Sequence, residues 1–339
     1  MRSITTSTTK ITRCTVAALI AAAMSLTAVA QQPGDKAKPK AKAKAKAKAQ
    51  PRAVERDGVV VERDVQYGTA GDRALKLDVI RPKEASAAPR PAIVWIHGGG
   101  WRGGDKSSGA RRLAAFAASG NYVCFSVGYR LSGEATWPAQ IHDCKAAIRW
   151  IKANASKHGV DPKRVGVWGS SAGGHLVSLL GTSGGVKDLE GANGSSDASS
   201  TVACVVDYCG PSDFVAFAEQ SPGAGTARSA ISGLFGGTVK EKHAEAVAAS
   251  PVTHVTKDDP PFLIVHGTKD PLVPLAQAEG LHAALQKAGC DVTFIKMDGG
   301  GHGIGGEAIT RRVATFFDIH LLGAKEKLSS EAIKVGARR

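Results

Sequence analysis

Short apolar runs and longer stretches with helical periodicity alternate along most of this 339-residue chain. Short apolar runs are typical of strands buried on both faces of a sheet, and apolar residues spaced three or four apart are typical of amphipathic helices. The predicted buried strands are Ala92–Ile96, Tyr122–Val127, Val165–Trp168, Val202–Val206, Phe262–Val265 and Val292–Ile295. The predicted helices are Arg111–Ala118, Pro138–His158, Ala172–Leu180, Leu275–Ala288 and Glu307–Leu322.

The alternation of strand and helix predicts parallel strands joined by crossover helices, with helices on both faces of the sheet. Two further β-rich runs, Val59–Tyr67 and Ala74–Ile80, flank the turn-rich stretch Gly68–Arg73 and predict an antiparallel hairpin ahead of the parallel strands. The pattern therefore predicts an α/β fold with a mostly parallel eight-stranded sheet flanked by helices. We expect one folded domain over residues 55–323.

One segment interrupts the alternation. About 55 residues separate the strand near Val206 from the strand near Phe262, which is more than a single crossover needs. We expect residues 210–260 to form additional helices over the ends of the strands. Two interpretations remain open, a small helical cap over a functional site and an excursion along the surface.

The N-terminal 30 residues are typical of a secretory signal peptide. Arg2, Lys10 and Arg13 precede an apolar run that ends in Ala28-Val29-Ala30, a small-residue cleavage pattern. A membrane anchor is the alternative, but the apolar run is short for a spanning helix, which needs about 20 residues. We therefore expect a secreted or periplasmic protein without a membrane span in its mature form.

The charge of the chain is concentrated at its two ends. The chain holds 44 Lys and Arg against 30 Asp and Glu, a formal net charge of +14, but residues 1–52 alone hold 11 basic residues and a single acidic one. Residues 31–54 alternate Lys with Ala or Pro and are predicted to be a disordered linker, and residues 324–339 form a basic tail. The linker is either a soluble spacer or an electrostatic contact for an anionic surface. It lacks interleaved aromatic residues, so we expect no nucleic-acid partner.

Cysteine usage indicates no metal centre. Removal of the signal peptide leaves five cysteines, so at least one has no partner within the chain. Cys204 and Cys209 are close in sequence and export would permit a bridge between them, although connectivity cannot be deduced from sequence. No Cys or His spacing matches a structural zinc site.

The segment Gly169-Ser170-Ser171-Ala172-Gly173 lies between a predicted strand and a predicted helix. A serine on such a strained turn stands clear of the backbone, so Ser171 is a candidate nucleophile. The stretch Gly181-Thr182-Ser183-Gly184-Gly185 matches the same pattern, but it follows a helix and leads into a loop. We therefore select only Ser171.

A nucleophilic serine needs a histidine base and an acid that orients the base. His302 lies among glycines after the last strand, and Asp270 directly follows the strand that ends near Val265. This order of Ser, Asp and His along the chain suits the predicted fold. Asp298 is the second choice for the acid, whereas Asp258 and Asp259 precede their strand, at the wrong edge of the sheet.

The segment His97-Gly98-Gly99-Gly100-Trp101 follows the third strand. Glycines allow consecutive backbone N–H groups to point into one concavity, where they can stabilise an oxyanion. We assign Gly98 and Gly99 as donors, together with the N–H of Ala172. A phosphate-binding loop is the weaker interpretation because no Gly-Lys-Ser/Thr follows. His97 is predicted to brace the loop and His175, next to Ser171, to have a structural role.

These motifs resemble those of α/β-hydrolase fold esterases with an HGGGW oxyanion loop, in the branch related to hormone-sensitive lipase, carboxylesterases and bacterial feruloyl/acetylxylan esterases. The matching segments, within Val59 to Leu322, are His97–Trp101, Gly103–Lys106, Gly128–Leu131, Trp137–Gln140, Asp143, Gly169–His175 and His266–Asp270. The Lys-Ala linker and the glycines around His302 depart from the family pattern. The resemblance implies ester hydrolysis through an acyl-enzyme without a cofactor, and substrate contacts from Trp101 and Trp137.

The resemblance and the predicted export together favour short-acyl or feruloyl esters on plant polysaccharide. A generic carboxylesterase or lipase acting on small or lipid esters is the main alternative. A serine exopeptidase would share the order of the three residues, but such enzymes usually carry a large N-terminal domain that this chain has no room for. A catalytically inactive binding protein would be expected to lack Ser171, Asp270 or His302.

Overall fold

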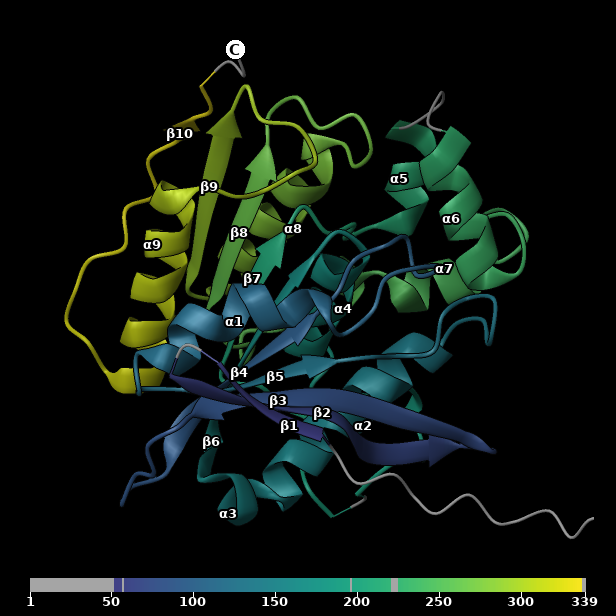
Figure 1. Ribbon diagram of the computed structural model, residues 1–339. Helices are drawn as coiled ribbons and strands as arrows, with labels where there is room; N and C mark the ends of the chain where they lie inside the picture. Colours follow the sequence, from purple (N-terminus) through teal and green to yellow (C-terminus); the bar gives the residue numbers. More distant parts are fainter. Residues whose placement is uncertain (1–51, 57, 196, 221–224, 337–339) are drawn as a thin grey trace, which may run out of the picture. The chain divides into compact units, whose positions relative to one another are not determined.

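A mixed sheet of ten strands runs through the part of the chain that the computed structural model describes, residues 52–56, 58–195, 197–220 and 225–336 (Figure 1). The strand order is β1-β2-β3-β5-β4-β6-β7-β8-β9-β10. The strands are β1 Arg52–Arg56, β2 Val59–Ala70, β3 Arg73–Pro82, β4 Arg90–Ile96, β5 Val123–Val127, β6 Val160–Ser170, β7 Cys204–Tyr208, β8 Phe262–Gly267, β9 Val292–Asp298 and β10 Ile333–Lys334.

Helices connect these strands and cover both faces of the sheet. The helices are α1 Ser108–Ala118, α2 Ala139–Ala153, α3 Ala155–His158, α4 Ala172–Thr182, α5 Phe214–Gln220, α6 Gly225–Phe235, α7 His243–Ala249, α8 Leu275–Ala288 and α9 Glu307–Phe317. Shorter helical turns are η1 Lys187–Leu189, η2 Pro251–His254 and the π-helical η3 Asp318–Leu322. Among the described residues, no helix combines the length and the apolar character needed to cross a membrane.

The predicted fold class is confirmed. Strands β2 to β9 are the eight expected ones: β2 pairs antiparallel with β3, β3 pairs antiparallel with β5, and the others pair in parallel. Two short edge strands add to them. β1 pairs antiparallel with β2, and β10 pairs parallel with β9.

The two edge strands lie at or beyond the predicted ends of the folded domain. β1 begins at Arg52, within the predicted linker 31–54, and β10 lies within the predicted tail 324–339. An edge strand is held by backbone hydrogen bonds and needs little apolar surface, so composition gives a weak signal for it. The predicted signal peptide and the Lys-Ala repeat lie outside the described residues.

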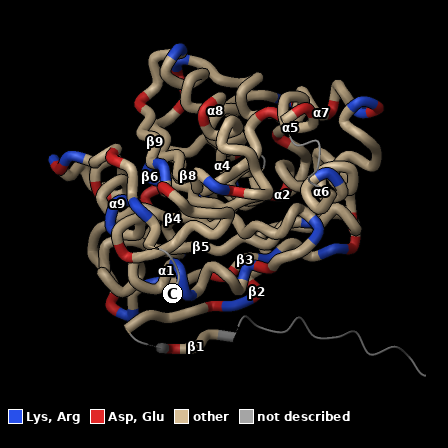
Figure 2. The backbone as a smooth tube through the Cα atoms, turned by 90° about the horizontal axis from the view of Figure 1, so that it is seen from above, with Lys and Arg blue, Asp and Glu red and all other residues tan. Residues whose placement is uncertain are grey.

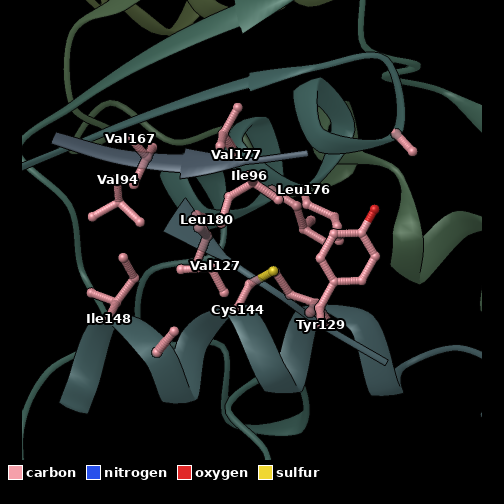
Figure 3. Packing of buried hydrophobic residues seen from close by; sticks show 14 of the residues in the cluster. Val94, Ile96, Val127, Tyr129, Cys144, Ile148, Val167, Leu176, Val177 and Leu180 are labelled. Atoms are coloured by element: carbon pink, nitrogen blue, oxygen red, sulfur yellow. The ribbon is translucent and has the colours of Figure 1, made fainter. Parts of the chain in front are cut away.

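Alternation along the strands divides the buried side chains between two apolar clusters. Val94 and Ile96 of β4 belong to one cluster, with residues of α2, α4 and α8, whereas Ile93 and Trp95 belong to the other, with residues of α1 and α9. Figure 3 shows side chains of α2 and α4 packed together with strand residues such as Val94 and Val167. Because side chains in a strand alternate in direction, each buried strand contributes to both layers of the core.

The long segment between β7 and β8 forms the helices α5, α6 and α7 and the turn η2. In Figure 1, α5, α6 and α7 lie together on the right, beyond the strands and α4. Phe214, Phe217, Ile231, Leu234 and Phe235 of this segment join the apolar cluster that holds α4. The insertion is therefore anchored by apolar packing. We refer to α5 and α6 as the cap helices.

All five cysteines of the described residues are free thiols. Cys204 begins β7 and Cys209 follows its last residue, so extended backbone separates them by about 16 Å at roughly 3.3 Å per residue. A disulfide needs Cα atoms closer than about 7 Å. The bridge that export would permit is thus not formed.

Basic and acidic residues alternate around the outline of the described part of the protein (Figure 2). This distribution agrees with the sequence, in which the excess of positive charge lies near the ends of the chain.

Candidate active site

Ser171 occupies a sharp turn between β6 and α4. Its φ is +58° and its ψ is −121°, a conformation that L-residues rarely adopt. A Cβ on Gly169 would lie 2.1 Å from the Gly173 carbonyl oxygen, and a Cβ on Gly173 would lie 2.1 Å from the Ile96 carbonyl oxygen. Glycine is therefore required on both sides of the elbow, which explains the small flanking residues seen in the sequence.

The second serine that matches the sequence pattern lies in a different environment. Ser183 is buried at the end of α4, where its hydroxyl donates a hydrogen bond of 2.6 Å to the carbonyl oxygen of Leu179. A hydroxyl that caps a helix carbonyl inside the protein has no access to a substrate. The strand before Ser171 and the helix after it were therefore the sequence features that distinguished Ser171 from Ser183.

His302 lies between Ser171 and Asp270. Its Nε2 is 2.8 Å from Ser171 Oγ, and its Nδ1 is 2.7 Å from Asp270 Oδ2. A carboxylate can only accept a hydrogen bond, so Nδ1 carries the proton and Nε2 accepts from the serine hydroxyl. The three residues predicted from the sequence are brought together in the geometry that a nucleophile, its base and an orienting acid require.

The side chain of Asp270 is buried and held by several donors. Its Oδ1 accepts hydrogen bonds from the backbone N–H groups of Leu272 and Val273, at 2.8 and 3.0 Å. The ring Nε2 of His266 lies 3.4 Å from its Oδ2. Burial by itself raises the pKa of Asp270, but hydrogen bonds from His266, His302 and Val273 outweigh it and hold the pKa well below its ordinary value. Asp270 is therefore ionised near pH 7, where its carboxylate can accept the hydrogen bond from His302 Nδ1.

The other candidate acids lie elsewhere. Asp298 accepts a hydrogen bond from the Thr268 hydroxyl at 3.5 Å, and no hydrogen bond joins it to His302 among the described residues. Asp258 and Asp259 bond to Thr256 and Lys257 in the turn before β8. The preference for Asp270 agrees with this geometry.

The glycine loop after β4 lies against the elbow. A Cβ on Gly98 would lie 2.7 Å from the Ser170 carbonyl oxygen, and one on Gly99 would lie 2.2 Å from the Gly103 carbonyl oxygen. Gly99, Gly100 and Trp101 have φ values of +116°, +60° and +56°. The loop is thus a tightly packed run of unusual backbone that depends on glycine.

The predicted oxyanion donors are available to a ligand. Among the described residues, the N–H groups of Gly98 and Gly99 donate to no backbone carbonyl in their loop. Ala172 is the first residue of α4, so its N–H has no acceptor within the helix. Gly98 and Gly99 line the same pocket as Ser171. Within the part of the chain that the structure describes, three N–H groups without a backbone acceptor therefore lie around the nucleophile.

Two histidines hold this loop, as the sequence analysis expected. His97 stacks on Tyr129 with ring centroids 4.4 Å apart, and its Nδ1 donates to the Gly98 carbonyl at 2.8 Å. His175 accepts a hydrogen bond at Nδ1 from Trp101 Nε1 at 3.2 Å and donates from Nε2 to the Ala249 carbonyl at 2.8 Å. Burial lowers the pKa of His175 to about 4, so its ring is neutral near pH 7 and can perform both functions.

A pocket of about 600 Å³ opens above Ser171. Its walls include the glycine loop, His302, Pro211 after β7, and the cap residues Phe217, Thr226, Ala227, Ala230 and Ile231. The insertion between β7 and β8 is therefore a cap over the site, the first of the two interpretations left open by the sequence.

The two tryptophans predicted to contact substrate differ in position. Trp101 lines the pocket, although its side chain is almost fully buried. Trp137 does not line it: its ring is 6.1 Å from the His175 ring and its backbone N–H donates to Leu234 at 2.8 Å. Trp137 is thus buried by packing against His175 and the end of α6, outside the residues that line the pocket, and its substrate contact stays a prediction.

Two arginines of the pocket wall were not selected from the sequence. Arg102 follows the glycine loop and Arg112 lies on α1. Nothing in the sequence indicated that this part of α1 borders the site.

Cys209, Asp270 and His302 bring potential ligand atoms within 4.8 Å of one another. Burial raises the pKa of the Cys209 thiol, which donates to the His302 carbonyl oxygen at 3.4 Å. Metals bind the thiolate, and both ring nitrogens of His302 are already occupied. This donor set does not fit a metal ion.

A serine, an acid and a histidine, each at the carboxyl end of a strand in this sheet, define a protein of the α/β-hydrolase fold. Within that class, the chain belongs to the BD-FAE family, whose family model matches residues 77–285.

Curated and solved relatives support this assignment. Esterase LipC of Mycobacterium tuberculosis is 33% identical over 72% of this chain and 60% of its own length. The structure of a truncated carbohydrate esterase from gut microbiota is 32% identical with a TM-score of 0.69, over 80% of this chain and 100% of that one. Thermogutta terrifontis esterase 2 phosphorylated by paraoxon is 26% identical with a TM-score of 0.64, over 80% of this chain and 96% of that one. The chain spans 51 to 60% of the length of LipC and two other mycobacterial esterases.

Proposed function

We propose that this protein is a serine esterase that hydrolyses carboxylic esters through an acyl-enzyme. The observation that carries the proposal is the pair of hydrogen bonds at His302, 2.8 Å to Ser171 Oγ and 2.7 Å to Asp270 Oδ2. Membership in the BD-FAE family and the similarity to proteins named as esterases support it.

In the proposed acylation, Ser171 Oγ attacks the carbonyl carbon of the ester while its proton passes to His302 Nε2. The carbonyl oxygen becomes an oxyanion that accepts hydrogen bonds from the N–H groups of Gly98, Gly99 and Ala172. When the tetrahedral intermediate collapses, the alkoxide leaves with the proton from His302 and the acyl group remains on Ser171.

In the proposed deacylation, a water molecule gives a proton to His302 Nε2 and attacks the acyl-enzyme carbonyl. Collapse of the second tetrahedral intermediate releases the carboxylic acid and returns the proton to Ser171. Asp270 accepts the Nδ1 proton of His302 throughout and stabilises the positive charge that the ring acquires in both steps.

We further propose short-acyl or feruloyl groups on plant polysaccharide as substrates. A relative of known structure is named a carbohydrate esterase, and a pocket of about 600 Å³ is large enough for an acyl group together with part of a sugar. The apolar cap residues favour a second candidate, a carboxylesterase acting on small or lipid esters. An aminopeptidase-like activity is disfavoured because no Asp or Glu is among the described residues that line the pocket and could bind a substrate ammonium.

Export to the periplasm or the medium is proposed from residues 1–30 of the sequence alone. N-terminal sequencing of the protein from cell fractions tests it. Mature protein beginning near Gln31 in the exported fraction is expected, and an intact Met1 in the cytoplasm would contradict export.

The esterase proposal is tested with 4-nitrophenyl acetate and paraoxon. The wild type is expected to release nitrophenolate and to gain one diethylphosphoryl group on Ser171, as located by peptide mass spectrometry. Ser171→Ala should do neither. Ser183→Ala, in the second copy of the pattern, is the matched control and should retain both. Equal background hydrolysis by wild type and Ser171→Ala would overturn the proposal.

A further inference from the structure

We propose that Arg112 binds a carboxylate of the substrate, so that this protein prefers ester substrates that carry a carboxylate group. The inference rests on the proposed esterase function and adds a substrate class to it.

Arg112 is held in the pocket wall by aromatic rings. Its guanidinium carbon lies 4.6 Å from the ring centroid of Trp95, 5.1 Å from that of Trp168 and 5.7 Å from that of Tyr208. Tyr208 is next to the nucleophile, since its carbonyl oxygen accepts the backbone N–H of Ser171 at 2.7 Å. The cation therefore lies on a rigid aromatic surface that is connected directly to the elbow.

The guanidinium of Arg112 has no polar partner among the residues that the structure describes. None of their hydrogen bonds or ion pairs includes it, although most other partly buried arginines, such as Arg130 and Arg149, bind carboxylates. Burial lowers the pKa of Arg112, yet a guanidinium keeps its charge at any physiological pH. A partly buried cation with unused donors on the wall of a pocket is suited to bind an anion from outside the protein.

The rest of the pocket favours the same charge. Arg102 also lines it, and no Asp or Glu is among the described lining residues. The other lining side chains are mainly apolar or small, so little within the pocket screens the two cations. A carboxylate would be attracted into this site, whereas an ammonium group would be repelled.

A carboxylate is the anion that this arrangement fits best. The guanidinium is a planar fork that can bind a planar carboxylate with two parallel hydrogen bonds. The rings of Trp95, Trp168 and Tyr208 lie close to the cation but offer it no carboxylate, so its N–H donors remain for a ligand. The carboxylate could belong to the acyl group, as in a half-ester of a dicarboxylic acid, or to the alcohol, as in an acylated sugar acid.

A purely structural role for Arg112, in which it only stabilises the aromatic cluster, leads to different behaviour. A structural arginine would affect every substrate equally through protein stability. A carboxylate-binding arginine would affect only substrates that carry the charge, mainly through KM. The two roles are therefore separated by comparing charged substrates with neutral ones.

The experiment uses two matched pairs of esters with full-length protein. For the acyl side, mono-4-nitrophenyl succinate is compared with methyl 4-nitrophenyl succinate by nitrophenolate release. For the alcohol side, an O-acetylated methyl glucuronoside is compared with the corresponding O-acetylated methyl glucoside by acetate release. The proteins are wild type, Arg112→Gln, Arg112→Lys and Arg111→Gln, the last being an exposed position on the same helix.

The wild type is expected to prefer the charged member of at least one pair by about tenfold in kcat/KM, because a bidentate charge-assisted pair forms. Arg112→Gln should abolish the preference through KM and leave the neutral ester within about twofold, and Arg112→Lys should retain part of it. Arg111→Gln should match wild type. The pair that shows the preference identifies which side of the ester bond carries the carboxylate.

Three results would overturn the inference. Equal kcat/KM for both members of both pairs in the wild type would do so without any variant, even if Arg112→Gln failed to fold. A preference that survives in Arg112→Gln would assign it to another residue, and an equal loss on charged and neutral esters would show a structural role. Absence of hydrolysis of all four esters, together with no labelling by paraoxon, would instead refute the proposed esterase function.

Discussion

The ring of His302 lies 2.8 Å from the hydroxyl of Ser171, although the two residues are 131 positions apart in the chain. Ser171 directly follows β6 and His302 follows β9, and these parallel strands are separated in the sheet by β7 and β8. The turn that carries Ser171 and the glycine-flanked loop that carries His302 bring the two side chains together across those two strands. The site therefore depends on the relative placement of the strand ends, and its parts can be tested separately.

Replacement of Asp270 by Asn should leave the fold intact and lower kcat by about 10³- to 10⁴-fold. The Asn amide can still accept from Leu272 and Val273 at its oxygen, but its NH₂ group would face His302 and favour the wrong tautomer of the ring. Initial rates on 4-nitrophenyl acetate test this. Asp298→Asn is the control and should remain close to wild type. If Asp298→Asn lowered kcat more than Asp270→Asn, Asp298 rather than Asp270 would be the acid.

A methyl group at Gly99 should disrupt the oxyanion loop. Its Cβ would meet the Gly103 carbonyl oxygen at 2.2 Å, and φ of +116° is unfavourable for alanine. We expect Gly99→Ala to lower kcat by about 100-fold, the loss typical of one oxyanion donor. Gly133→Ala, where a Cβ meets nothing within 4 Å, is the control. Equal activity of both variants would show that Gly99 does not position a donor.

Protein stability should decrease as the pH falls from about 6.5 to 4, partly because of His175. Burial lowers the pKa of His175 to about 4 in the folded protein, so only the unfolded chain takes up this proton within that range. The stabilisation is complete above the unfolded pKa of about 6.5 and is lost as the pH falls toward 4, by about 3 kcal/mol.

This pH dependence is measured by urea unfolding at pH 7 and pH 4.5. In His175→Gln the decrease in unfolding free energy between the two values should be smaller than in wild type. His243→Gln, at an exposed position on α7, should leave the decrease unchanged. An identical pH dependence in wild type and His175→Gln would show that the ring titrates alike in the folded and unfolded states.

A large side chain on the cap should restrict the acyl group. Ala227 of α6 lines the pocket, so Ala227→Trp should reduce kcat/KM for 4-nitrophenyl octanoate by about tenfold more than for the acetate. Ala244→Trp, at an exposed position of α7, should change neither. If Ala227→Trp affected both esters equally, the acyl chain would not extend toward the cap.

The element order and the three central residues could be predicted from the sequence because their signals are local. Apolar runs identify buried strands, and parallel strands place their carboxyl ends at one edge of the sheet. Ser171, Asp270 and His302 each follow such a strand, and the residues around Ser171 distinguish it from Ser183. The sequence only suggested a need for small residues around Ser171 and at Gly99. The structure explains it, because a Cβ at these positions would collide with nearby backbone.

Other features had no local signal. Trp137 packs against His175 outside the pocket lining, and Arg112 seemed an ordinary helix residue. The edge strands β1 and β10 arise from backbone pairing that needs no apolar pattern. Contacts of this kind depend on which loops and helices meet after folding.

The amino-acid sequence was sufficient to predict the α/β architecture and to select Ser171, Asp270 and His302 as candidates, because periodicity and strand-end position are encoded by neighbouring residues. Three features became visible only in the folded protein: α5 and α6 cover the site, Trp101 lines the pocket and Trp137 does not, and Arg112 lies in the pocket wall with no polar partner in the described part of the chain. These are relations between segments far apart in the chain. They follow from close packing of side chains in three dimensions, which no local pattern records.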